Sequence, residues 1–319
     1  RLFIVAVLAQ LKRFYKGNPL ASSFIHLRVH TEFSLVDGLV KVKGLLGQTE
    51  TLAMPAVAIT DENNLCGFVR FYKGAMGAGI KPICGADVMV AASDGLEKNT
   101  RFTLLAMSNL GYKNIIEVIS KGYQLGQVQG RPIVQKAWLE AHSDDVIALS
   151  GAQYGDIGEY LDTDQVDLAK QQMRHWMQVY PNRFYIELQR TNRPGEEDYL
   201  HAVVPLALEL ACPVVATNDV RFLHRSDFEA HEARVCIHDG VTLDDPRRPK
   251  RYSEEQYLKS SAEMEALFED LPEALENTVE IAKRCNVEVL LGEYFLPDFP
   301  VPEGLTMDQY FRKLAHDGL

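Results

Sequence analysis

The sequence predicts an α/β fold in which helices cover a mainly parallel sheet that closes into a barrel. Short apolar runs rich in β-branched and aromatic residues alternate with longer stretches of helical period, which is typical of strand–helix units in a parallel sheet. About seven such units occur without a dinucleotide-type glycine loop, and this favours a closed barrel over an open sheet. The chain has 319 residues, 46% of them hydrophobic, which is enough to bury a large core.

The predicted strands are the β-rich apolar runs, and the predicted helices are the stretches between them in which apolar residues recur every three or four positions. The strands span residues 24–30, 55–60, 83–90, 101–108, 145–151, 183–189 and 213–219. The helices span residues 40–53, 65–78, 112–121, 165–179 and 196–211.

Polar side chains gather where several of the predicted strands end. They are His30 with Thr31, residues 60–64, Ser150, Glu187 with Gln189, and Asn218 with Asp219. In parallel barrels the carboxyl ends of the strands share one rim, and sites are built there. Turns are polar in any protein, which explains single cases, but the recurrence of acids and amides at five strand ends favours a site.

The region after residue 222 is predicted to be helical. A helix is expected over 228–240, and two or three more over 257–286, with Ser260 or Ser261 as the candidate N-cap. Residues 292–304 contain three prolines and predict an extended linker before a last helix.

These patterns divide the chain into three expected parts. Residues 1–23 carry four basic and no acidic residues without a clear signal sequence, so we leave them as an unassigned extension. Residues 24–290 form the main domain. Residues 291–319 form a linker and the beginning of a further region, which stops as a new helix begins and so resembles a truncation.

Composition limits the classes of function. A net charge of −11 argues against nucleic-acid binding over the whole surface, because phosphate contacts need clustered Lys and Arg. No run of about 18 apolar residues predicts a membrane span. The five cysteines form no CxxC pair, which favours buried thiols in a reducing cytoplasm; they are Cys66, Cys84, Cys212, Cys236 and Cys285.

Residues 244–252 contain the dense basic cluster of the sequence, with Arg247, Arg248, Lys250 and Arg251. A solvated loop balanced by Asp244 and Asp245 is the expected role, and a contact with template phosphate or with a neighbouring domain is the alternative.

Isolated serines and histidines give weaker signals. Ser34 and Ser150 have no histidine base that the sequence identifies, so a nucleophilic role is not expected. His231 is seven residues from His238, whereas a zinc pair on a helix needs a spacing of four, so it is expected to be a helix-face histidine.

Six motifs in order carry a family resemblance. HLRVHTEFSLVDG, AITDENNLCG, GIKPICGADV, ALSGAQYGD, FYIELQRT and VVATNDVRFL resemble the amino-terminal polymerase-and-histidinol-phosphatase (PHP) domain of bacterial replicative DNA polymerase III alpha subunits. The resemblance begins near Phe24 and continues to the end of the chain. It implies a distorted seven-stranded (β/α) barrel with extra carboxyl-terminal helices. Active members of the family hold up to three metal ions with nine ligands and use metal-activated water to attack a phosphoester.

Four of the nine ligand positions keep a donor of the same kind as the family. His30, Asp37 and Asp219 match it unchanged, and Asp87 replaces a glutamate. If any metal binds, the resemblance implies that these four residues hold it.

The other five ligand positions are altered. Arg28, Arg101 and Arg221 replace histidines, Glu62 replaces another histidine, and Ala152 replaces a cysteine or histidine. Arginine cannot ligate a metal, and alanine has no donor atom. We therefore expect a vestigial site without catalytic residues, cofactor or metal, in which the arginines form salt bridges with the remaining acids.

The resemblance also implies the activity of the whole subunit, which is a nucleotidyltransferase that performs template-directed DNA synthesis with magnesium. The catalytic carboxylates would belong to a palm domain that begins within residues 291–319 and continues beyond this chain, so the chain would meet DNA only as part of that polymerase. Its expected role is structural: it stabilises the polymerase and binds the carboxyl-terminal segment of the proofreading exonuclease, epsilon. The alternatives are an active metal-dependent phosphoesterase or proofreading nuclease and a stand-alone PHP hydrolase.

Overall fold

The computed structural model describes residues 24–92, 95–294, 296 and 299–319. The predicted extension at 1–23 lies outside these residues. The chain divides into a large unit that ends at Glu288 and a small unit over Val289–Leu319.

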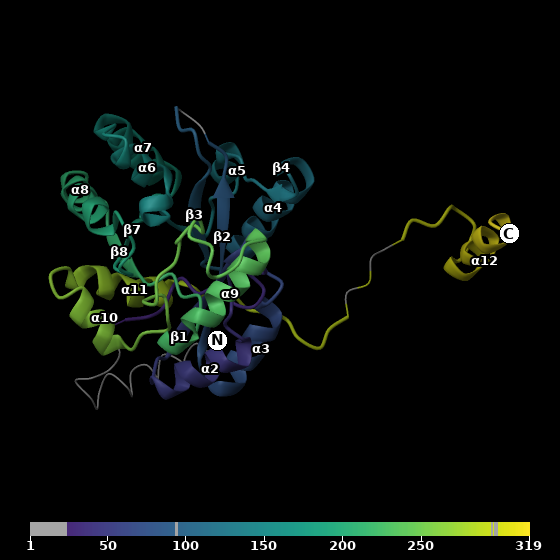
Figure 1. Ribbon diagram of the computed structural model, residues 1–319. Coiled ribbons are helices and arrows are strands. Elements are labelled where there is room, and N and C mark those ends of the chain that lie inside the picture. Colours follow the sequence, from purple (N-terminus) through teal and green to yellow (C-terminus); the bar gives the residue numbers. More distant parts are fainter. Residues whose placement is uncertain (1–23, 93–94, 295, 297–298) are drawn as a thin grey trace. The chain divides into compact units, whose positions relative to one another are not determined.

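A curled sheet forms the centre of the large unit (Figure 1). Among the described residues it has six strands in the order β1-β2-β3-β6-β7-β8. Their bounds are Ala56–Glu62 (β1), Lys81–Val90 (β2), Thr100–Ala106 (β3), Val146–Leu149 (β6), Phe184–Gln189 (β7) and Val214–Thr217 (β8). A separate hairpin joins Gln127–Val128 (β4) to Arg131–Pro132 (β5).

The strand β3 departs from the predicted parallel arrangement, because it runs antiparallel to both β2 and β6. The pairs β1–β2, β6–β7 and β7–β8 are parallel as predicted. Residues 91–99 connect β2 to β3 and are too few for the crossover of a dozen or more residues that a parallel neighbour needs. As a result, Arg101 at the start of β3 pairs with Met89 at the end of β2, and so reaches the rim of the sheet.

The predicted strand over 24–30 was wrong as a strand assignment. The segment is extended, but its backbone bonds are shared between two partners, so no continuous ladder forms with either. Ala58 and Thr60 of β1 donate to its carbonyls at 2.9 and 2.8 Å. His30 donates to the carbonyl of Val220 at 2.9 Å, beyond the end of β8. The segment therefore bonds both to β1 and to the chain that follows β8.

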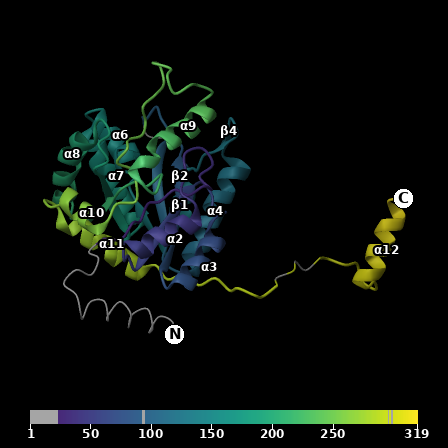
Figure 2. The ribbon, with the colours of Figure 1, turned by 60° about the horizontal axis from the view of Figure 1, so that its bottom comes forward.

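Helices surround the sheet, as the views in Figures 1 and 2 show. All five helices predicted between strands are present: Val42–Thr51 (α2), Phe68–Ala78 (α3), Asn109–Leu125 (α4), Val166–Val179 (α7) and Glu196–Glu209 (α8). Two short helices were not predicted, Lys136–Ala141 (α5) and Asp156–Asp162 (α6), because six or seven residues are too few to establish a period.

The region after β8 is helical as predicted. It contains Phe228–Asp239 (α9), Ser261–Leu267 (α10) and Pro272–Arg284 (α11). Ser260 is the N-cap of α10, where its hydroxyl accepts from the backbone of Glu263 and the Glu263 carboxylate accepts in return. In the small unit, the described part of 289–305 contains neither helix nor strand, and Met307–Asp317 (α12) follows.

The cysteines are free thiols, and four of them are buried. Cys66 is exposed, so the expectation of buried thiols was wrong at this position. Among the described residues, no helix is both long enough and apolar enough to cross a bilayer.

A buried arginine–carboxylate cluster as the candidate functional site

The concave face of the sheet changes from apolar to charged along its strands. Because alternate residues of a strand point to the same face, Ile83 and Asp87 of β2 share this side, as do Tyr185 and Glu187 of β7. One end of this face holds the main apolar core, which α11 closes with Ile281. The other end holds buried charge, which we call the arginine–carboxylate cluster. Its members are Arg28, His30, Asp37, Glu62, Asp87, Arg101, Glu187, Arg193, Asp219 and Arg221.

Arg28 is central to this cluster and only 1% exposed. Its Nη2 lies 2.6 Å from Asp87 Oδ2, and its Nη1 donates to both carboxylate oxygens of Glu187 at 3.1 Å. Its Nε lies 3.6 Å from Asp219 Oδ1. Burial alone would lower the pKa of Arg28, but Asp87 and the other two carboxylates raise it well above its usual range. Arg28 is therefore a permanent cation at the position where the sequence resemblance implies a metal-ligating histidine.

Arg221 joins the second pair of acids. Its Nη1 lies 2.6 Å from Asp37 Oδ2, and its Nη2 donates to Asp219 Oδ1 at 2.8 Å. The Tyr252 hydroxyl also donates to Asp37, at 2.7 Å. Burial would raise the pKa of Asp37, but the charge of Arg221 and the other cations lower it to about 2. The pKa of Asp219 is likewise well below its usual range, because Arg221 and Arg28 outweigh the effect of burial.

His30 lies between the two carboxylates that a metal would share. Its Nε2 is 3.2 Å from Asp87 Oδ2 and 3.5 Å from Asp219 Oδ1. This nitrogen nevertheless makes no hydrogen bond of good geometry with any of the described residues. Its Nδ1 is 3.0 Å from Ser34 Oγ. The structure thus places a histidine, His30, next to Ser34, which the sequence alone did not reveal. Ser34 nevertheless donates its single proton to Asp61, at 2.8 Å, and is buried, so it is not an activated nucleophile.

Arg101 and Glu62 form the more exposed edge of the cluster, with side chains that are 21% and 33% exposed. They are 3.4 Å apart, and Arg101 also lies 3.4 Å from Asp87. The remaining predicted position, Ala152, is buried after β6 and begins the 3-10 helix Ala152–Tyr154 (η1).

Two charged members of the cluster were missed by sequence reasoning. Glu187 was noted only as a polar strand end, yet it is fully buried and pairs with Arg28. Arg193 follows β7 and lies 3.0 Å from Asp219, 2.9 Å from Glu196 and 2.6 Å from Gln189. The alternation of Tyr185, Glu187 and Gln189 was a signal for Glu187, but no spacing rule would have selected a loop arginine.

The backbone is strained near the site. Asn63, Ala152 and Asp219 adopt positive φ values of 52°, 53° and 44°. Such conformations cost free energy in residues other than glycine, and they cluster at functional sites. All three positions lie within three residues of the end of a strand, namely β1, β6 and β8.

The donors of the cluster do not suit a metal centre. Among the described residues, no group of three or more His, Cys, Asp and Glu side chains is placed to hold an ion. The carboxylates of Asp37, Asp87 and Asp219 are already engaged by guanidinium groups. We therefore derive no chemical step through a metal.

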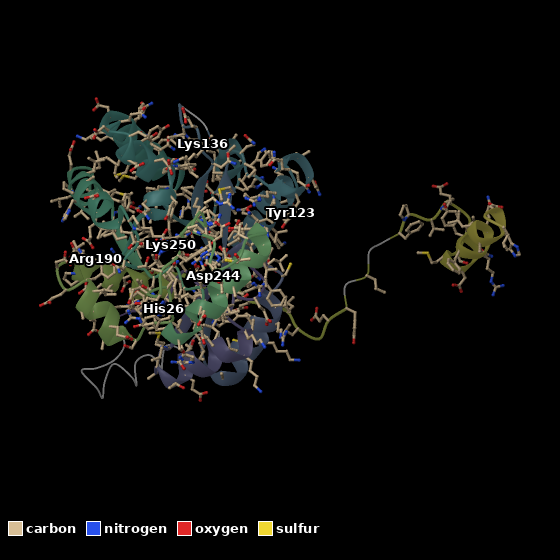
Figure 3. The ribbon with its side chains drawn as sticks, in the orientation of Figure 1. His26, Tyr123, Lys136, Arg190, Asp244 and Lys250 are labelled. Carbon is tan, nitrogen blue, oxygen red and sulfur yellow. The ribbon has the colours of Figure 1, made fainter. Side chains whose placement is uncertain are left out.

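The basic cluster at 244–252 is largely neutralised within the protein. Arg247 pairs with Asp245 at 3.0 Å, Arg248 pairs with Glu232, and Arg251 pairs with Asp239. Figure 3 labels Asp244 and Lys250 in this loop. The acids that balance the loop are thus Asp245, Glu232 and Asp239, where Asp244 and Asp245 were expected.

His231 lies on the buried face of α9. Its Nε2 is 2.9 Å from the carbonyl of Asp37 and its ring packs on Tyr252. It therefore positions the loop that carries Asp37.

Comparison with known proteins identifies the family. The sequence matches the PHP domain family over residues 26–191, which is just over half of the chain. The chain belongs to the PHP domain family.

Relatives of this PHP domain at high identity are DNA polymerase III alpha subunits. The chain is 57% identical over 297 residues to the subunit of Pseudomonas aeruginosa and 52% identical over 296 residues to that of Escherichia coli K12. Each alignment covers 93% of this chain and 25% of the relative, so the chain spans about a quarter of the length of these relatives.

Two solved structures show a distant likeness to this PHP domain. An amidohydrolase from Chromobacterium violaceum has 11% identity and a TM-score of 0.42, over 66% of this chain and 96% of that one. A putative metal-dependent phosphoesterase from Bifidobacterium adolescentis has 11% identity and a TM-score of 0.38, over 61% and 86% of the two chains.

Proposed function

We propose that this PHP domain is a metal-free scaffold within a replicative DNA polymerase alpha subunit and has no phosphoesterase activity of its own. The observation that carries the proposal is the contact of Arg28, Arg193 and Arg221 with the buried acids Asp87 and Asp219 and their neighbours. These guanidinium groups use the carboxylate oxygens that a metal would need.

Electrostatics supports this proposal. Two unit charges 4 Å apart interact by about 4 kcal/mol at an effective dielectric constant of 20. A divalent cation placed between Asp87 and Asp219 would lie beside the guanidinium of Arg28, which is 2.6 Å from one acid and 3.6 Å from the other. The resulting repulsion would oppose binding, and it would be about twice that for a single charge because the ion carries two.

The proposed biological role follows from the relatives. In the whole subunit, DNA synthesis and its magnesium would belong to parts outside this chain. The PHP domain would stabilise the polymerase and bind the carboxyl-terminal segment of the epsilon exonuclease. A cytoplasmic location fits that role. We further propose that segment 24–30 completes a seven-membered barrel, a closure supported by its bonds to β1 and to Val220.

Metal content and phosphatase activity test the metal-free proposal. The purified chain is expected to contain far less than one zinc or manganese per molecule by mass spectrometry, before and after incubation with Mn²⁺. It is also expected to release no nitrophenol from nitrophenyl phosphate. Near-stoichiometric metal that is lost in Asp219→Asn would overturn the proposal and favour an active phosphoesterase.

A binding experiment tests the docking role separately. The chain is expected to capture the epsilon exonuclease in a pull-down, and the carboxyl-terminal peptide of epsilon should compete. Because this assay does not depend on metal, the absence of binding would remove the docking role and leave the metal-free proposal standing.

A further inference from the structure

Exposed apolar side chains gather on one side of the large unit. Among its described residues, eleven large apolar side chains are exposed, and six of the eleven lie on α3, α4 or the β4–β5 hairpin. These six are Val69, Leu110, Ile116, Tyr123, Leu125 and Val128. Single exposed apolar residues are normal on a protein surface, whereas a group of them marks a binding surface. This side of the molecule is therefore a candidate for binding another molecule.

The helices α3 and α4 are neighbours, so part of this group forms one face. The ring centre of Phe68 at the start of α3 lies 5.4 Å from that of Tyr112 in α4. Ile116 and Tyr123 follow Tyr112 by 4 and 11 residues, which puts them on the same side of α4. Burial raises the pKa of Tyr123, and the charge of the nearby Cys66 thiolate raises it further, so the chain just before α3 also reaches this face. We call it the α3–α4 face, and its residues are Cys66, Val69, Ile116 and Tyr123.

The margin of the α3–α4 face is basic, although the chain as a whole is acidic. The helix α3 carries Arg70 and Lys73 and no acid, and α4 carries Lys113, Lys121 and one acid, Glu117. Four cations and one acid give these two helices a net charge of +3, in a chain whose net charge is −11. Arg70, Lys73 and Lys113 are exposed, and none of them forms an ion pair within the described part of the chain. Their charges are therefore available to a partner.

We propose that the α3–α4 face binds an amphipathic helix of a partner protein that carries acidic side chains beside its apolar ones. The apolar side chains of this helix would pack on Val69, Ile116 and Tyr123, and its carboxylates would meet Lys73 and Lys113. Ile116 and Tyr123 are about 10 Å apart along α4, which is two turns, so apolar anchors at positions i and i+7 of the partner match them. The inference rests on the docking role proposed above, and it assigns to that role a surface and the chemistry of the segment that binds.

A nucleic acid is the alternative partner for a basic face. Binding of a single strand needs several aromatic rings on which bases stack, together with cations that follow the backbone. Tyr123 is the one aromatic side chain of the α3–α4 face, and its neighbours Val69 and Ile116 are aliphatic. This composition favours a protein segment.

The thiol of Cys66 reports directly on this face, because Cys66 is exposed while the other four cysteines are buried. The rate at which N-ethylmaleimide modifies Cys66 is measured by mass spectrometry, with and without the epsilon exonuclease. With epsilon at ten times its Kd, only about one chain in eleven is free, so the modification should slow about tenfold. An unchanged rate while epsilon is bound would overturn the inference.

A first pair of variants tests the apolar part of the face by calorimetric titration with epsilon. Ile116→Asp should weaken binding at least about tenfold, because it would bury a carboxylate against the apolar side of the partner helix. The control Leu208→Asp places the same charge on α8, at a side chain that is 82% exposed, and should change the affinity less than about twofold. Circular dichroism of each variant shows whether it is folded.

A second pair tests the charge. Lys73→Glu/Lys113→Glu should weaken epsilon binding about tenfold in 50 mM salt and less in 500 mM salt, because salt screens exposed charges. The control Arg174→Glu/Lys250→Glu makes the same change of charge at exposed positions elsewhere and should alter the affinity less than about twofold.

These measurements separate the inference from the docking role on which it rests. If the original chain does not bind epsilon, the docking role fails and the inference fails with it. If the original chain binds epsilon and Ile116→Asp and Lys73→Glu/Lys113→Glu bind it equally well, only the inference about the α3–α4 face fails. Binding of a single-stranded oligothymidylate that is lost in Lys73→Glu/Lys113→Glu, while epsilon binding is unchanged, would overturn the inference in favour of a nucleic acid.

Discussion

Replacing Arg221 by methionine tests the central physical claim, namely that guanidinium groups hold the rim together. Arg221 is 1% exposed, and its charge serves Asp37 at 2.6 Å and Asp219 at 2.8 Å. Methionine is unbranched and flexible, so it fills much of the same space without the charge. The substitution therefore removes the guanidinium partner of two buried carboxylates, Asp37 and Asp219, and leaves only a small cavity in place of the arginine side chain.

The expected loss of stability can be bounded from two sides. Breaking a buried ion pair by removing one partner costs about 3–5 kcal/mol. Independently, lowering the pKa of Asp37 from 3.8 to about 2 corresponds to roughly 2 kcal/mol at neutral pH, with Arg221 as the foremost lowering charge. A domain is stable by about 5–15 kcal/mol in total. Arg221→Met should thus lower the free energy of unfolding by about 3 kcal/mol.

Urea unfolding at pH 7, followed by circular dichroism, measures this loss. A double-mutant cycle with Asp37→Asn isolates the pair: the double variant should be less destabilised than the sum of the single variants, by about 1–3 kcal/mol. A loss below about 1 kcal/mol in Arg221→Met, or additive losses in the cycle, would refute the reasoning, because an exposed surface pair behaves in that way.

The folded-state pKa of Asp37 is lowered to about 2, so the ionised carboxylate stabilises the fold above its unfolded pKa near 3.9, and this stabilisation is lost as the pH falls. The difference in the free energy of unfolding between the original chain and Asp37→Asn should therefore disappear between about pH 4 and 2 in an acid titration. Gly38→Ala should lower thermal stability by about 1–3 kcal/mol, because its Cβ would lie 1.8 Å from the carbonyl oxygen of Thr31. Its matched control, Gly47→Ala in α2, meets nothing within 4 Å and should stabilise the chain by about 0.5–1 kcal/mol; a loss there would contradict the argument. Ile147→Ala in the apolar core should cost about 2–5 kcal/mol in urea unfolding, and a loss under 1 kcal/mol would contradict the proposed core.

Much of the fold could be predicted because local period and composition determine it. The helices α2, α7, α8 and α9 lie close to their predicted limits, since each is at least ten residues long. Strand direction could not be predicted in the same way. The short connection from β2 was a signal for the reversal of β3, but the pairing of β3 with the distant strand β6 is not contained in a local pattern.

The candidate site could be predicted only in part, for a related reason. Family motifs located Arg28, Arg101 and Arg221, and their contacts with acids follow from electrostatics once they share a rim. Arg193 lies in a loop after β7 without a recognisable motif, and only the folded chain brings it to Asp219. Site residues whose position depends on the conformation of a loop are therefore the ones that the sequence does not predict.

The cluster also shows how arginines at the expected metal-ligand positions can join distant parts of the chain. A metal site stabilises by joining ligands that are distant in the sequence, and Arg28 does the same: it bonds Asp87, 59 residues away, and Glu187, 159 residues away. Guanidinium suits this replacement because it is planar, always charged and able to make several directed bonds at once. Histidine ligands must be neutral to bind metal and are lost near pH 6.5, whereas the arginine pairs persist until the acids protonate. Arg28 thus connects strands that are distant in the sequence, which fits the scaffold role that we propose for this domain.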